Sequence, residues 1–203
     1  SKISTKIQLL ESLIRSVDKV IIGGAMANTF LKATANNIGA SLYETSCIDI
    51  ASGIVDLAKR KNVKLVLPVD AKVSKKLGDF PTAKNKILDE IEIDDMILDL
   101  GIESSRIILD EISDAKTVIW NGPLGAIEYK PFDQSTVSVA KELALRCKDK
   151  NSTVIVGGGD TIYGINIAGT YDDYTHVSTG GGAFLQWLEG KDLPAVEAIL
   201  NKH

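Results

Sequence analysis

The sequence lacks several features that define whole classes of proteins. Its 203 residues include only two cysteines, Cys47 and Cys147, which form neither a CxxC pair nor a metal-ligand spacing. This usage suits a reducing compartment, where both would be small buried side chains. No apolar run is long enough to cross a bilayer, and no signal peptide is recognisable. We therefore expect a soluble, cytoplasmic protein with no membrane partner.

The sequence also has no excess of positive charge and few histidines. The formal net charge is −4 at pH 7, and there are two histidines, His176 and His203. Because nucleic-acid-binding proteins concentrate excess Lys and Arg, we expect no nucleic-acid partner. Two histidines do not make a metal site without further ligands, and Ser178 lacks the GxSxG context of a hydrolase nucleophile. GxxxxGK[ST] and GxGxxG are absent as well, which excludes two common nucleotide-binding loops.

Glycine, in contrast, is frequent where strands are predicted to end. Residues 154–161 read VIVGGGDT, which predicts a buried strand, a turn and a helix start. The glycines leave room for an anion near the backbone, and a helix beginning there would direct N–H groups toward it. Asp160 is a carboxylate suited to Mg²⁺, and Asp160 or Thr161 could cap the helix. A turn that binds nothing remains the alternative.

Strands and helices are predicted to alternate along the chain. The predicted strands lie near residues 19–22, 63–68, 96–101, 117–120, 154–156 and 175–177. Alternation of this kind implies a parallel sheet with right-handed crossovers. We expect an α/β fold, a Rossmann-like three-layer α/β/α arrangement with a mainly parallel sheet, in which residues 1–203 form a single domain. The polar stretch 72–95 is predicted to be a surface excursion containing a small β-meander.

Four predicted strand ends carry glycine turns, at residues 23–24, 122–123, 157–159 and 180–182. The carboxyl ends of parallel strands lie at one edge of a sheet, so these turns predict a ligand cleft. Lys2 and Lys6 flank the first predicted helix start, where two ammonium groups would repel the helix dipole unless an anion joined them. Two solvated surface lysines are the alternative.

Six motifs together resemble the phosphoglycerate kinase family. They are SKISTKI (1–7), GGAMANTF (23–30), LPVD (67–70), WNGPLG (120–125), GGGDT (157–161) and HVSTGGG (176–182). Their order and spacing match along the whole chain, which corresponds to about half of a family member, the C-terminal, nucleotide-binding half. The resemblance implies that the N-terminal half, with the 3-phosphoglycerate site and a catalytic arginine, is absent.

The resemblance also implies a site for Mg-ADP or Mg-ATP along the glycine-rich strand ends. Asp160 would hold the metal, Asn121 would lie near the phosphates, and Glu128 would bind the ribose hydroxyls. The implied nucleotide-binding residues are Lys6, Gly23, Gly24, Leu98, Asn121, Gly122, Pro123, Glu128, Gly158, Gly159, Asp160 and Thr161. Those implied to act on the transferring phosphoryl group are Lys2, Lys6, Gly159, Gly181 and Gly182.

The implied reaction is reversible phosphoryl transfer between 1,3-bisphosphoglycerate and ADP, giving 3-phosphoglycerate and ATP in glycolysis. No general base is needed, because the acceptor carboxylate is ionised at neutral pH. We expect this chain to bind nucleotide without turnover, to meet both triose substrates only with the missing domain, and to belong to a monomeric enzyme. Ile97 and Ile102 depart from the family pattern near the adenine pocket. The alternatives are a stand-alone nucleotide-binding module and a sugar-phosphate-binding α/β protein.

Overall fold

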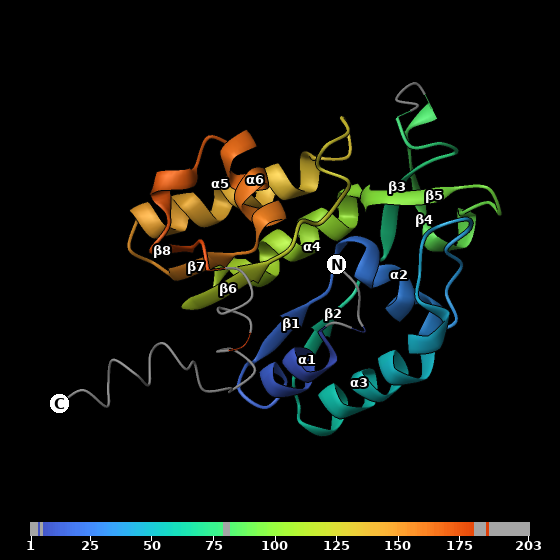
Figure 1. The fold of residues 1–203 in the computed structure, drawn as a ribbon, viewed down its shortest axis with the longest axis horizontal. Helices are drawn as coiled ribbons and strands as arrows, with labels where there is room; N and C mark the ends of the chain where they lie inside the picture. Colours follow the sequence, from blue (N-terminus) through green and yellow to red (C-terminus); the bar gives the residue numbers. More distant parts are fainter. Residues whose placement is uncertain (1–3, 5, 79–81, 181–185, 187–203) are drawn as a thin grey trace.

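The computed structural model describes residues 4, 6–78, 82–180 and 186. From residue 96 onward its strands and helices alternate as the sequence pattern predicts, whereas four strands between residues 64 and 100 follow one another with no described α-helix between them (Figure 1). In chain order, with η for a 3₁₀ helix, they are α1 (Ile7–Leu13), β1 (Lys19–Ile21), α2 (Gly24–Ala33), η2 (Thr45–Cys47), α3 (Ile48–Arg60), β2 (Lys64–Val66), β3 (Asp70–Ser74), β4 (Lys84–Ile87), η4 (Leu88–Glu90), β5 (Met96–Leu100), α4 (Ile102–Ser113), β6 (Thr117–Asn121), α5 (Gln134–Lys148), β7 (Thr153–Gly157), α6 (Gly159–Ile167), η5 (Tyr171–Asp173) and β8 (His176–Ser178).

Most of the described strands pair in parallel. β1 pairs with β2, and β7 lies between β6 and β8, in two parallel sheets. The register places Asn121 opposite Gly157, and Gly157 opposite Ser178. The carboxyl ends of β6, β7 and β8 therefore form one row at a single edge. The predicted α/β class with mainly parallel strands is confirmed.

Helices cover both faces of β1 and β2. Val20, Ile22 and Leu65 face a core built with α1, α2 and α3. Ile21 and Val66 point to the opposite face, into a core built with α4, α5 and α6. Because successive side chains of a strand alternate between its faces, these two strands lie between two helical layers, as Figure 1 shows. The predicted three-layer, Rossmann-like arrangement is therefore confirmed.

The prediction for residues 72–95 is wrong for the order of the strands and for the burial of β3. β3, β4 and β5 form an antiparallel sheet in the order β4-β3-β5, whereas a meander would place its strands in chain order. All five residues of β3 are buried, whereas most of the described residues from 75 to 94 are exposed, so the surface prediction holds for that part and fails for β3. The strand can be buried although it contains Asp70 and Lys72, because both side chains have hydrogen-bond partners elsewhere in the fold, which the local sequence does not reveal. Within the described residues, no helix is both long and apolar enough to span a membrane.

Candidate functional site

The turn after β7 presents the amino end of α6. Gly158, at φ 94°, precedes the helix, and its carbonyl accepts the N–H of Ile162 at 2.9 Å. The N–H groups of Gly159, Asp160 and Thr161 therefore lie in the first turn, ahead of the first hydrogen bond within the helix. The predicted cap by Asp160 or Thr161 is wrong, because Gly158 occupies the cap position and no side chain caps it. These amides and the positive end of the helix dipole suit an anion.

The Thr161 hydroxyl has a different role from the predicted cap. Its Oγ accepts the N–H of Gly122 at 2.6 Å, and the residue is fully buried. Thr161 thereby joins α6 to the turn after β6. Sequence alone could not identify this contact, because the two residues are 39 positions apart.

The Asn121 side chain connects three segments at this edge. Its Nδ2 donates to the carbonyl of Gly157 at 2.9 Å, and its Oδ1 accepts a hydrogen bond from the Nζ of Lys6. A Cβ added at Gly158 would lie 2.9 Å from Asn121 Nδ2. The residue at this position must therefore be glycine, because its φ is positive and because a side chain would collide with Asn121.

The glycine turn after β1 lies against the turn after β6. The N–H of Gly24 donates to the carbonyl of Leu124 at 3.1 Å. A Cβ at Gly23 would lie 2.5 Å from Leu124 Cδ2, and one at Gly24 would lie 2.9 Å from the carbonyl oxygen of Pro123. Three of the four predicted glycine turns are thus gathered in one place.

Opposite charges lie near each other at this place. Burial lowers the pKa of the half-buried Lys6 ammonium, and the attraction of Asp160 opposes that shift. Asp160 itself is exposed, in the first turn of α6. Mg²⁺ commonly binds through one or two protein carboxylates and the phosphates of its substrate. An exposed carboxylate beside amide donors and an ammonium group fits such a metal-phosphate ligand.

Other predicted site residues lie along the loop between β6 and α5 or beside it. The carbonyl of the half-buried Leu98 accepts the N–H of Ala126 at 2.7 Å, which ties this loop to β5. Glu128 is exposed on the same loop, and Pro123 is half-buried near its start. Ile102 is 71% exposed. Lys2, Gly181 and Gly182 lie outside the described residues.

Sequence reasoning missed two side chains that anchor this loop. Thr136 Oγ accepts the N–H of Leu124 at 3.0 Å, and Asp99 Oδ2 accepts the N–H of Ser135 at 3.2 Å. For Asp99 there is a signal in the sequence, because an acid inside the apolar strand MILDL must have partners if that strand is buried. Thr136 gives no comparable signal.

Replacing Thr161 with valine should destabilise the protein by about 1–2 kcal/mol, because it leaves the N–H of Gly122 without its acceptor at nearly unchanged volume. Urea unfolding followed by circular dichroism would measure the change. Thr153→Val, the same replacement at an exposed position of β7, is the control and should stay within about 0.5 kcal/mol of the unaltered protein. Equal effects of the two substitutions would contradict the assigned hydrogen bond.

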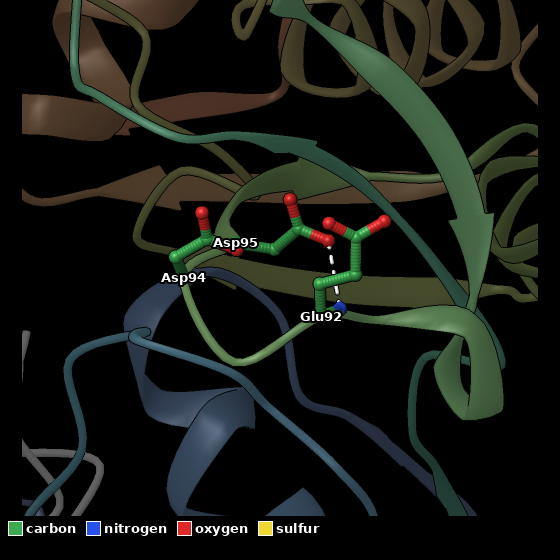
Figure 2. A group of neighbouring side chains, drawn as sticks. All are labelled: Glu92, Asp94 and Asp95. Carbon is green, nitrogen blue, oxygen red and sulfur yellow. Dashed lines mark hydrogen bonds between the residues drawn. The ribbon is translucent and has the colours of Figure 1, made fainter.

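A second group of acids lies in the loop before β5. Carboxylate oxygens of Glu92, Asp94 and Asp95 lie within 4.8 Å of one another (Figure 2). Lys86 binds Glu92 and Asp95 at 2.8 Å each, and Lys75 binds Glu92 at 2.5 Å and also contacts both aspartates. Because two ammonium groups already offset these charges, the group is a salt-bridge network that ties the loop to β4 and to the residue that follows β3.

Comparison with known proteins identifies the family. The family model for phosphoglycerate kinase matches residues 1–191. Phosphoglycerate kinase from Methylorubrum extorquens is 47% identical over 98% of this chain and 50% of the relative, and that from Caulobacter vibrioides is 46% identical with the same coverage.

Solved structures give the same result. The phosphoglycerate kinase of Coxiella burnetii superposes with a TM-score of 0.93 at 41% identity, covering 99% of this chain and 51% of that one. The enzyme of Pyrococcus horikoshii gives a TM-score of 0.74 at 26% identity, covering 98% and 50%. The chain thus spans about half the length of the relatives that it matches. It belongs to the phosphoglycerate kinase family.

Proposed function

We propose that this chain is the C-terminal, nucleotide-binding half of a phosphoglycerate kinase and that it binds Mg-ADP or Mg-ATP. One observation carries the proposal. Lys6 and Asn121 come from distant parts of the chain and meet through a hydrogen bond, and Asn121 also binds the turn that opens α6. The ammonium group and the helix amides therefore lie together at the edge where the resemblance implies phosphate.

The proposed roles follow from the chemistry of each group. Lys6 and the amides of Gly158, Gly159 and Thr161 bind phosphate oxygens, and Asp160 binds Mg²⁺. When bound, Mg²⁺ supplies positive charge that neutralises the phosphate oxygens. Gly23, Gly24, Gly122 and Pro123 form the backbone walls, and Leu98 and Glu128 meet the base and the ribose.

Phosphoryl transfer requires positioning and charge stabilisation more than covalent chemistry, and this arrangement supplies both. Lys2, Gly181 and Gly182 are proposed to stabilise the phosphoryl group in flight, together with Lys6 and Gly159. The acceptor, the carboxylate of 3-phosphoglycerate, needs no proton removed. We propose that both triose substrates bind only when the N-terminal half is present, that the 203 residues form one domain, and that the complete enzyme is a cytoplasmic, glycolytic monomer.

Replacing Asp160 with alanine should weaken Mg-ADP binding by about 10- to 100-fold, because the metal loses its protein ligand. Calorimetric titration with Mg-ADP, repeated with EDTA, would measure this. The control Asp56→Ala removes an equal charge from an exposed position of α3 and should leave the affinity unchanged. Absence of binding at millimolar Mg-ADP would overturn the proposal.

A second measurement separates half an active site from a complete one. The chain alone, given 3-phosphoglycerate and ATP, should form no ADP in a coupled assay. Turnover under these conditions would show that the catalytic groups are all present in these 203 residues. Binding of sugar phosphates in place of nucleotide would favour the alternative of a sugar-phosphate-binding protein.

A further inference from the structure

Two charged side chains are buried together beneath the loop between β6 and α5. Lys72 of β3 is 9% exposed and Asp99 of β5 is 1% exposed. The register places them directly opposite each other in the antiparallel pair, so both side chains leave the sheet on the same face. Neither has a role in the proposed nucleotide site. Burying two charges is costly, so their retention calls for a physical explanation.

Lys72 binds the end of this loop. Its Nζ donates to the carbonyl of Pro131 at 3.3 Å and to Oε1 of Gln134, the first residue of α5. A lysine close to the amino end of a helix is unfavourable for the helix dipole. Its hydrogen bonds and the negative charge of Asp99 across the strand pair offset that cost.

Asp99 binds the same region from the neighbouring strand. Its Oδ2 accepts the N–H of Ser135 in the first turn of α5, and its Oδ1 accepts the N–H of Leu100 at 2.9 Å. The loop also closes on this carboxylate, because a Cβ at Gly125 would lie 2.4 Å from Asp99 Oδ1 and 2.3 Å from the carbonyl oxygen of Phe132. Lys72 and Asp99 therefore fix both the close packing at Gly125 and the start of α5.

The anchored loop carries Glu128 between these two fixed points. Gly125 lies three residues before it and Pro131 three residues after it. Glu128 itself is exposed. Lys72 and Asp99 thus constrain its position through the backbone of the loop. The phosphate-binding groups lie elsewhere, because Lys6, Asn121 and α6 are joined by their own hydrogen bonds.

We propose that Lys72 and Asp99 are positioning residues, which hold the loop between β6 and α5 so that Glu128 meets the nucleoside part of the bound nucleotide. This inference rests on the proposed function. It separates the site into two parts: a phosphate part that does not depend on Lys72, and a nucleoside part that does. The two parts can be measured with two ligands, Mg-ADP and Mg-pyrophosphate, of which the second has no ribose and no base.

The test compares the affinities of these two ligands by calorimetric titration. Lys72→Met keeps the length of the side chain and removes its charge and its hydrogen bonds to Pro131 and Gln134. We expect this substitution to weaken Mg-ADP binding by about tenfold, the size of one lost charged hydrogen bond, and to change Mg-pyrophosphate binding less than about twofold. Gln134→Ala removes only the acceptor on α5. It should shift the ratio of the Mg-ADP affinity to the Mg-pyrophosphate affinity in the same direction, which keeps the test valid if Lys72→Met does not fold.

Lys86→Met is the matched control. Lys86 lies in β4 of the same sheet and binds Glu92 and Asp95, away from α5. Its replacement should lower the melting temperature without changing the ratio of the two affinities. An equal shift of the ratio in Lys86→Met, or an unchanged ratio in both Lys72→Met and Gln134→Ala, would overturn the inference. Failure of the unaltered chain to bind Mg-ADP would instead overturn the proposed function, and this inference with it.

Discussion

Replacing Gly101 with alanine is expected to destabilise the protein by about 4 kcal/mol, at the upper end of the range for a single substitution. The added Cβ would lie 2.1 Å from Asp70 Cγ and 2.3 and 2.4 Å from its carboxylate oxygens. Asp70 has little freedom to move, because it accepts the N–H of Glu103 at 3.0 Å and that of Ser104 at 2.7 Å. The substitution thus combines overpacking with loss of the hydrogen bonds at the start of α4.

Gly53→Ala is the matched control for this substitution. Gly53 lies inside α3, and a Cβ there would meet nothing within 4 Å. Because alanine favours the helix over glycine, this variant should be more stable by about 1 kcal/mol. Urea unfolding of both variants would give opposite signs. Unchanged stability of Gly101→Ala would show that Gly101 and Asp70 are not in such tight contact.

The second large effect concerns the pH dependence of stability. Burial raises the pKa of Asp99 to about 6, against the hydrogen bonds from Ser135 and Leu100 and the charge of Lys72. In the unfolded chain an aspartate titrates near pH 3.9. The folded protein therefore binds this proton more tightly, and Asp99 contributes a stabilisation that is complete below about pH 4 and lost as the pH rises through 6. The difference between these limits is roughly 3 kcal/mol.

Comparison with Asp99→Asn isolates this contribution, because an amide does not titrate. Other acids act in the opposite direction: hydrogen bonding to Lys64, for example, lowers the pKa of Glu111, so protonation of Glu111 destabilises the fold in acid. These effects are common to both proteins. Urea unfolding of both proteins from pH 4 to 7.5 would measure this. The free energy of unfolding of the unaltered protein should fall relative to that of Asp99→Asn as the pH rises to about 6, and the difference between the two proteins should be constant above that pH. Parallel curves across this range would contradict the raised pKa.

The parallel part of the fold was predictable because its signals are local. β-branched strands such as β7 are followed at once by glycines and by a helix, and each such unit implies its own crossover. The register then confirms that Asn121, Gly157 and Ser178 lie in one row at the edge of the sheet. The antiparallel sheet was not predictable in this way. Its buried strand contains Asp70 and Lys72, whose partners Ser104 and Gln134 lie 34 and 62 residues away.

The candidate site also combines features that the local sequence predicts with contacts that it does not predict. The glycines and Asp160 follow predicted strand ends, so their shared position could be anticipated from topology. The Thr161 and Asn121 contacts could not, because a hydroxyl or an amide gives no indication in the sequence of which backbone group it will bind.

The hydrogen bond between Lys6 and Asn121 has a consequence for the order of folding. It joins residues 115 positions apart, and the bond from Asn121 to Gly157 spans a further 36. The entropy of closing such long loops must be overcome before these contacts contribute, whereas a helix such as α3 needs only its neighbours. During synthesis, Lys6 and the turn after β1 leave the ribosome long before β6 and β7 do. A nascent chain can therefore contain native helices while the proposed phosphate-binding edge does not yet exist.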